Sequence, residues 1–377
     1  MTKFIDMATT LSVRSFRTAL LRWFAKHQRD LPWRHTHDPY AIWISETMLQ
    51  QTQVATVRSY YERFLERFPN VWQLADAEEA EVLRLWAGLG YYRRARQLHA
   101  AAKQICDQHE GQFPPELEKL QHLPGIGRYT AGAILSFAYD APAPIVEANT
   151  SRVYCRLLAL TAPPSQAATQ KELWTFAESL QPTSGGSGAL NQALMELGSL
   201  VCTPQAPQCA DCPVKKYCRA YAAGLENEVP CRPAKQKFTA LHHALIIVQK
   251  QKDFLVRRNP AGGWWEGLWD FPRVDITETM TALVSKKTPT ERILVETCQA
   301  AFQAKFDLHL DSISHVHTLR HGVTRYRIRL DCFRATSLRL KKLPNEFQWL
   351  PLPAIELLGL TSTGRKMLRW ISAQDFS

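Results

Sequence analysis

The feature that most constrains this chain is a run of cysteines, CTPQAPQCADCPVKKYC, with the spacing C-x6-C-x2-C-x5-C. Thiolates so close in sequence can surround one compact metal centre, which ties down the loop that carries them. The spacing lacks the two separated C-x2-C pairs of a zinc ribbon, so a [4Fe–4S] cluster is favoured over zinc and over disulfides. The predicted ligands are Cys202, Cys209, Cys212 and Cys218.

Length and charge limit the function classes that fit. A chain of 377 residues is expected to form two domains. Its net charge of +11 favours a polyanionic partner such as nucleic acid. No apolar run reaches the roughly 18 residues of a membrane helix, so no membrane partner is expected. The start of the chain has apolar residues at helical spacing and is expected to be a core-facing helix rather than a targeting segment.

The composition and the predicted secondary structure of the chain change near residue 227. Residues 11–226 are predicted to be consecutive helices with short breaks, including the long stretch YAIWISETMLQQTQVATVRSYYERFLERF. Residues 227–239 are polar and contain proline, which indicates a linker. Residues 240–377 contain strand-like runs such as TRYRIRLDCF and one helical run, TERILVETCQAAFQAKF, which predicts an α+β domain.

A second motif, LPGIGRYTAGAIL, places Gly125 and Gly127 between two helical runs. Two glycines at such a turn let backbone N–H groups approach a phosphate at a helix N-terminus. Any tight helical hairpin could use the same turn, so the motif alone is a moderate indication of a helix-hairpin-helix. About twenty residues later a single carboxylate, Glu147, stands in PIVEANTSRVY.

The order of hairpin, carboxylate and four-cysteine loop resembles the helix-hairpin-helix DNA glycosylases of the endonuclease III superfamily. The stretches LPWR, DPYAIWISETMLQQTQV, GLGYYRRARQLHAAA, ALMELGSLVC and GLWDFP narrow the resemblance to the MutY-type adenine glycosylases. The resemblance implies an all-α helix-hairpin-helix glycosylase domain with an iron–sulfur cluster loop at 202–218, followed by an α+β Nudix-like domain. It implies double-stranded DNA with adenine opposite 8-oxoguanine or guanine as substrate, bound by a monomer.

The chemistry of adenine excision assigns roles to particular side chains. Glu46 lies among apolar residues, and desolvation raises the pKa of a carboxyl group, so Glu46 is predicted to be the general acid. The sugar cation that forms needs a nearby carboxylate, and the matching position is Glu147. The family motif adds Tyr129 and Asn149 to the catalytic group. Tyr129 stands where bifunctional relatives carry a Schiff-base lysine, so a monofunctional glycosylase without lyase activity is expected.

The resemblance also implies residues that hold DNA. Base flipping needs a wedge in the stack and a pocket for the extruded base. The implied wedge residues are Gln51 and Tyr91, with Gln50 alongside. The implied adenine pocket consists of Trp33, Arg34 and Glu196. Gly125 and Gly127 are expected to bind phosphate, and His321 is expected to face 8-oxoguanine.

Two departures from the family's pattern keep a second function open. The family's usual Asp-Gly-Asn is Glu147, Ala148 and Asn149 here, and a displacement of about 1 Å costs on the order of 100-fold in rate. The family's usual Phe-Ser-His is Leu319, Arg320 and His321. The alternative is therefore a lesion-binding DNA protein that is non-catalytic or altered in specificity.

The second domain is not expected to hydrolyse nucleotides. A Nudix hydrolase needs a carboxylate-rich helix to hold Mg²⁺, and the corresponding run supplies only Glu291 and Glu296. Arg325, Arg327 and Arg329 alternate on one predicted strand face, which suits either solvent or DNA. The expected location is the cytoplasm and nucleoid of a bacterium, or the nucleus or mitochondrion of a eukaryote.

Overall fold

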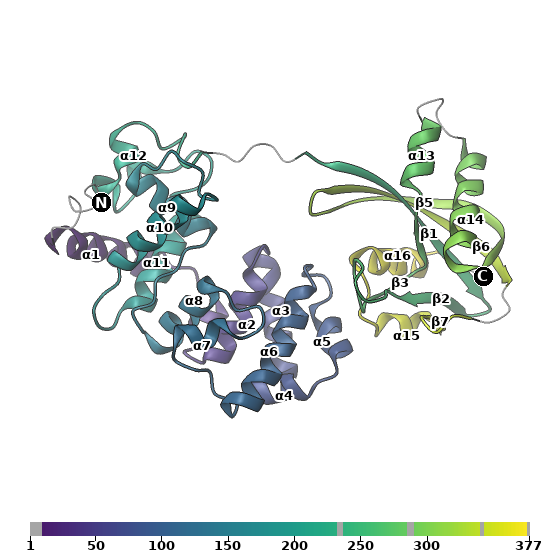
Figure 1. Ribbon diagram of the computed structural model, residues 1–377, viewed down its shortest axis with the longest axis horizontal. Helices are drawn as coiled ribbons and strands as arrows, with labels where there is room; N and C mark the ends of the chain where they lie inside the picture. The colour runs from purple at the N-terminus through teal and green to yellow at the C-terminus, as the bar shows by residue number, and fades with distance from the viewer. Residues whose placement is uncertain (1–9, 232–236, 285–289, 340–342, 375–377) are drawn as a thin grey trace. The chain divides into compact units, whose positions relative to one another are not determined.

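A computed structural model describes residues 10–231, 237–284, 290–339 and 343–374 (Figure 1). The chain divides into two compact units, Met1–Ala77 with Arg93–Ala234, and Glu78–Tyr92 with Lys235–Ser377. The segment Glu78–Tyr92, inside the predicted first domain, is thus grouped with the second unit. The predicted linker lies partly outside the described residues.

The first unit is entirely helical over its described residues. Its α-helices are α1 (Thr10–His27), α2 (Pro39–Leu49), α3 (Val54–Arg67), α4 (Val71–Asp76), α6 (Arg93–His109), α7 (Leu117–Gln121), α8 (Arg128–Tyr139), α9 (Ala148–Leu158), α10 (Ala167–Ser179), α11 (Ser187–Leu200) and α12 (Arg219–Ala222). Three short 3₁₀ turns are η2 (Pro32–Arg34), η3 (Cys209–Asp211) and η4 (Lys215–Tyr217). The expectation of an all-α region is confirmed.

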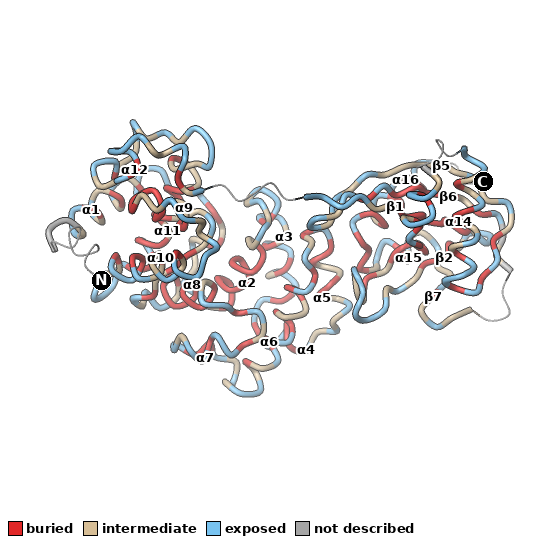
Figure 2. The backbone as a smooth tube through the Cα atoms, turned by 45° about the horizontal axis from the view of Figure 1, so that its top comes forward, coloured by how far each residue is buried: buried red, intermediate tan, exposed pale blue. Residues whose placement is uncertain are grey.

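Helix α2 is buried along almost its whole length (Figure 2). It begins where the Asp38 side chain accepts a hydrogen bond from the backbone N–H of Tyr40, with Pro39 in the first helical position. The stretch predicted as helical does not continue through to α3. Helix α2 ends at Leu49, and Gln51 adopts a left-handed backbone with φ of 57°. The intervening turn has no glycine or proline, so sequence breakers do not mark it.

The described residues of the second unit form a mixed sheet and five helices. The strands are β1 (Thr239–Lys250), β2 (Asp253–Arg258), β3 (Trp269–Asp270), β4 (Arg273–Asp275), β5 (His309–Val323), β6 (Tyr326–Arg339) and β7 (Phe347–Pro351). The helices are α5 (Glu79–Trp86), α13 (Thr277–Val284), α14 (Glu291–Phe306), α15 (Leu352–Glu356) and α16 (Ser362–Ser372). The main strand order is β3-β2-β1-β6-β5, with β4 and β7 pairing to β1 and β2.

Apolar residues fill both faces of this sheet. Helices α13 and α14 pack on one face through Met280, Cys298 and Phe302. Helices α15 and α16 pack on the other through Ile355 and Met367 (Figure 1). The β1–β6 pair is parallel and the other pairs are antiparallel. This arrangement confirms the predicted α+β domain.

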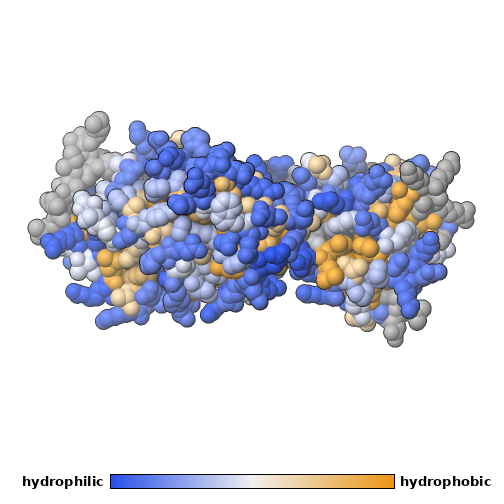
Figure 3. Space-filling view, turned by 90° about the horizontal axis from the view of Figure 1, so that it is seen from below, coloured by the Kyte–Doolittle hydropathy of each residue, from blue (hydrophilic) through white to orange (hydrophobic). Residues whose placement is uncertain are grey.

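The alternation predicted for β6 is also present. Arg327 and Arg329 are exposed, whereas Ile328 and Leu330 are buried. On the face seen in Figure 3, hydrophilic side chains dominate and apolar ones form separate patches. Within the described residues, none of the helices combines the length and apolarity that crossing a bilayer requires.

Candidate active site

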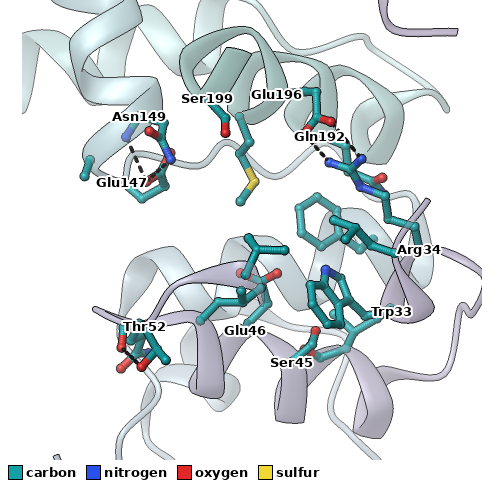
Figure 4. Close-up of a pocket in the computed structure, with 18 of the residues that line it drawn as sticks. Trp33, Arg34, Ser45, Glu46, Thr52, Glu147, Asn149, Gln192, Glu196 and Ser199 are labelled. Carbon is teal, nitrogen blue, oxygen red and sulfur yellow. Dashed lines mark hydrogen bonds and ion pairs between the residues drawn. The ribbon is translucent and has the colours of Figure 1, made fainter. Parts of the chain in front are cut away.

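A cavity of about 490 Å³ lies inside the first unit (Figure 4). Its walls come from η2, α2, the turn after α2, α8, the start of α9, and α11. The predicted site residues that line it are Trp33, Arg34, Glu46, Gln50, Gln51, Tyr129, Glu147, Asn149 and Glu196. Residues from far apart in the sequence therefore meet in one space of the size that encloses a small organic group.

Glu46 is a buried carboxyl group on α2, with 3% of its surface exposed. The hydroxyl of Tyr129 on α8 donates a hydrogen bond to its carboxylate. Burial raises the pKa of Glu46 to about 7, and the proximity of Glu147 adds to the rise, although the hydrogen bond from Tyr129 and the charge of Arg34 lower it. Glu46 can therefore both give and take a proton near neutral pH.

Glu147 is the N-cap of α9, and its carboxylate folds back onto the start of its own helix. The two oxygens accept hydrogen bonds from the backbone N–H of Asn149 at 2.8 Å and of Thr150 at 2.8 Å. The Thr150 hydroxyl in turn accepts from the Glu147 N–H, which completes a capping box. Burial raises the pKa of Glu147, and the two backbone hydrogen bonds oppose that rise.

The two carboxyl groups occupy different walls of the cavity. In Figure 4, Glu46 rises from α2 beside Ser45, whereas Glu147 and Asn149 extend from the wall formed by α9 and α11. Trp33, 8% exposed, closes another side. The cavity thus places an indole and two carboxyl groups around one space.

Glu196 of α11 is held by two arginines. Arg29 donates to it from Nε at 2.9 Å and from Nη2 at 2.8 Å, and Arg34 donates from Nη2 at 2.8 Å. Burial opposes the effect, but these hydrogen bonds lower the pKa of Glu196 to about 2, so it stays ionised. Sequence reasoning missed Arg29, since its partner lies 167 residues away.

Several other residues that line the cavity were assigned no role from the sequence. These are Ser45, Thr52, Phe137, Gln192, Met195 and Ser199. Ser45, Thr52, Met195 and Ser199 lie within the quoted family stretches, whereas Phe137 and Gln192 lie in none of them.

The glycines of the hairpin lie outside this cavity, as expected for a phosphate contact. Gly125 has a left-handed φ of 77°, and a Cβ there would stand 2.8 Å from the Cβ of Gln97. Gly127 is the N-cap of α8, and a Cβ on it would meet no atom within 4 Å. The backbone at Gly127 is therefore open at a helix N-terminus, where anions bind favourably.

Tyr91 and His321 belong to the second unit and are not among the residues that line the cavity. The Tyr91 side chain is 46% exposed on a left-handed backbone, as suits a residue that contacts another molecule. The His321 ring lies against Trp265, and both of its nitrogens are buried without a hydrogen-bond partner. Burial and the charge of Arg273 lower the pKa of His321 to about 4, so the ring is neutral at pH 7.

The four cysteines of the loop lie near one another. Within the described residues, Cys202, Cys209, Cys212 and Cys218 form no disulfide. Burial raises the pKa of Cys212 to about 12; the backbone N–H of Val214 lowers it and the other three thiols raise it. No described group of three or more His, Cys, Asp and Glu side chains is spaced for a single metal ion. Four thiols carried by one loop are the donor set that a [4Fe–4S] cluster uses.

Comparisons with known proteins match both units. A family model described as "HhH-GPD superfamily base excision DNA repair protein" matches residues 44–179, and a Nudix domain model matches residues 243–370. Over 304 residues the chain is 34% identical to the adenine DNA glycosylase of Buchnera aphidicola subsp. Acyrthosiphon pisum, covering 79% of this chain and 85% of that protein.

Longer relatives match at higher identity over shorter stretches of this chain. The chain is 44% identical over 241 residues to mouse adenine DNA glycosylase and 46% identical over 217 residues to the human protein. These matches cover 62% and 55% of this chain but only 46% and 40% of those proteins, so the chain spans less than half of their length. Among solved structures, a thermostable thymine-DNA glycosylase matches with a TM-score of 0.52 at 29% identity, over 57% of this chain and 99% of its own.

Proposed function

The chain belongs to the adenine DNA glycosylase family, and from that premise we propose that it excises adenine mispaired with 8-oxoguanine or guanine in double-stranded DNA. The observation that carries the proposal is the buried Glu46, with a pKa of about 7, in one cavity with Glu147. The alternative of a lesion-binding protein without turnover is not favoured, because the relatives are named as glycosylases.

Glu46 supplies the proton that adenine needs to leave. It transfers that proton to a ring nitrogen of the flipped base, and the bond between C1′ and N9 breaks with its electron pair going to the base. The Tyr129 hydroxyl holds the Glu46 carboxyl in place. Water then attacks C1′, and the Glu46 carboxylate takes the proton that the water releases, which restores the starting state.

Glu147 stabilises the positive charge that develops on the sugar. Its position is set by the backbone of α9, since both of its oxygens accept N–H hydrogen bonds there. A carboxylate fixed before the charge develops needs no reorganisation in the transition state. Lyase chemistry is not proposed, because the position of the amine nucleophile is Tyr129 and no lysine occurs between Lys119 and Lys171.

The four-cysteine loop would hold a [4Fe–4S] cluster, through Cys202, Cys209, Cys212 and Cys218. The cluster would fix the fold of the loop between α11 and α12. Arg156 supports the ligand set, since its Nη1 donates to the Cys202 sulfur at 3.2 Å. The Nudix-like unit would recognise 8-oxoguanine through His321, and the chain would act as a monomer wherever chromosomal DNA lies, in nucleoid, nucleus or mitochondrion.

A direct test uses matched duplexes that hold adenine opposite 8-oxoguanine, guanine or thymine. We expect adenine release from the first two and none from the third, with strand breaks appearing only after alkali treatment. Release from none of them would overturn the proposed excision, and strand breaks without alkali would overturn the monofunctional assignment.

A further inference from the structure

The end of α2 is closed by a side chain from another helix, Arg94 of α6. Its Nη1 donates to the backbone carbonyl oxygens of Thr47 at 2.7 Å, Met48 at 3.1 Å and Gln50 at 2.5 Å. Its Nη2 donates to the Thr52 hydroxyl at 3.3 Å. One guanidinium therefore spans the last turn of α2 and the turn that follows it.

The free-energy cost of burying the Arg94 cation is offset by the carbonyl groups at the end of α2. Arg94 is 9% exposed, so its charge has lost nearly all contact with water. The last carbonyl groups of a helix lack partners within the helix and carry partial negative charge. A guanidinium with its fixed fork of donors can bind several of them at once, which the single ammonium of a lysine does less well.

The turn held by Arg94 presents two glutamines in different ways. The Gln50 amide donates to the Thr130 hydroxyl on α8 at 3.3 Å, so its side chain points back to the helix that carries Tyr129. Gln51 is exposed on a left-handed backbone. A non-glycine residue in that conformation is strained and persists only where its surroundings fix it. The hydrogen bonds from Arg94 to both sides of Gln51 are such a restraint.

Arg94 also lies against the hairpin. Arg94 and Gln50 line a cavity of only about 10 Å³ together with Pro124 and Gly125 of the hairpin. The next turn of the same helix contacts the hairpin through Gln97, which leaves no room for a side chain at Gly125. Helix α6 thus supports both the turn after α2 and the predicted phosphate-binding turn.

We propose that Arg94 is a positioning residue for base flipping, which fixes the Gln50–Gln51 turn relative to the hairpin that grips the DNA backbone. The inference rests on the proposed function for the role of that turn, and it adds a residue that touches neither base nor phosphate. Loss of Arg94 frees the carbonyl oxygens at the end of α2 and lets the Gln51 backbone relax. Displacement of the wedge by about 1 Å would slow excision on the order of 100-fold.

The test separates flipping from excision and from general DNA binding. A duplex with 2-aminopurine opposite 8-oxoguanine reports flipping, because the analogue fluoresces more when it leaves the base stack. Single-turnover adenine release, Kd for an undamaged duplex, and circular dichroism are measured beside it. The variants are Arg94→Met and Arg94→Lys, with Lys103→Met as the control, since Lys103 is exposed on the same helix.

We expect Arg94→Met to lose most of the fluorescence rise and to slow adenine release about 100-fold, while its Kd for undamaged duplex stays within about threefold, since the charge of Arg94 contacts no phosphate. Arg94→Lys should be intermediate and Lys103→Met should match wild type. If Arg94→Met does not fold, the same comparison is made with Arg94→Lys.

Other outcomes overturn the inference. Normal flipping in both Arg94 variants would do so, as would slow release with a normal fluorescence rise, because Arg94 would then act on Glu46 rather than on the wedge. A wild-type protein that flips the analogue but releases no adenine would refute the proposed excision and leave the Arg94 comparison valid. A wild-type protein that does not flip it would refute the role of the turn and this inference with it.

Discussion

Glu147 combines two roles in one side chain, because the carboxylate that faces the cavity also caps α9. The extra methylene of Glu, relative to the Asp that the family's motif has, is taken up by folding the chain back onto the helix start. The carboxylate is then fixed by the backbone N–H groups of Asn149 and Thr150. The longer side chain is thus compatible with a well-placed charge.

A substitution that removes only the charge should separate these roles. Glu147→Gln keeps an oxygen acceptor for the helix start but cannot stabilise a cation, so we expect a folded protein whose single-turnover rate is lower by about 100- to 1,000-fold. Glu147→Asp keeps both charge and cap and should retain most of the activity. Equal rates for wild type and Glu147→Gln would show that the charge is not used.

The pH dependence of excision should report Glu46. Burial raises the pKa of Glu46 to about 7, and the hydrogen bond from Tyr129 lowers it from what burial alone would give. The protonated form is the active one, so the rate should fall as pH rises through about 7. Tyr129→Phe removes the lowering contribution, and the fall should move to higher pH. A fall that stays in place or moves to lower pH would contradict this assignment.

The local sequence around Glu46 and the family resemblance at Glu147 predicted these two site residues, but not the residues that support them. Glu46 was recognisable from the apolar residues around it and from the motif, and burial confirms that environment. Arg29 was not recognisable from the sequence, because only folding brings it close to its partner, Glu196. Long-range pairing leaves no periodicity in the sequence.

At the level of elements, α9 links the site to the four-cysteine loop. Arg152 on α9 donates from Nε to the Cys202 carbonyl oxygen at 2.7 Å, and from Nη2 to the Gly198 carbonyl oxygen at 2.6 Å and to the Asn149 side chain at 2.9 Å. Asn149 in turn donates to Glu147. A continuous set of hydrogen bonds therefore runs from a predicted cluster ligand to the carboxylate.

Breaking that link should affect both stability and rate. Arg152→Met leaves the carbonyl oxygens of Gly198 and Cys202 without this donor, and we expect the free energy of unfolding to fall by about 2–3 kcal/mol. Adenine release should slow as Asn149 loses its support. Denaturant unfolding and single-turnover release measure the two effects, with Lys171→Met as the control because Lys171 is exposed on α10. A variant with wild-type stability and rate would show that these hydrogen bonds contribute to neither the free energy of unfolding nor the rate of adenine release.

Periodicity predicted the helices of the first region, and helix α14 and strands such as β6 of the second. It predicted neither the end of α2 nor the helices α13, α15 and α16. The sequence from Leu49 to Val54 contains no glycine or proline, and its polar residues are compatible with a helix. The break is held by Arg94, more than forty residues away. Tertiary contacts, rather than local preference, end this helix.

At the level of the whole chain, the second unit is expected to recognise rather than to hydrolyse. Helix α14 carries only two acidic residues, Glu291 and Glu296, and Glu296 is paired with Arg292 at 2.8 Å. We therefore predict that the full chain with Mg²⁺ releases no pyrophosphate from 8-oxo-dGTP. A colorimetric assay for phosphate after pyrophosphatase treatment checks this, and turnover above the level of Glu296→Gln would contradict it.

The role of Glu46 as the general acid is tested most sharply by single-turnover adenine release from a duplex with adenine opposite 8-oxoguanine, comparing wild type with Glu46→Gln. We expect rapid release by wild type and almost none by Glu46→Gln, with both proteins binding the duplex equally well. Tight binding with no release by wild type would contradict it and would mean that this cavity holds adenine without cleaving its bond to the sugar.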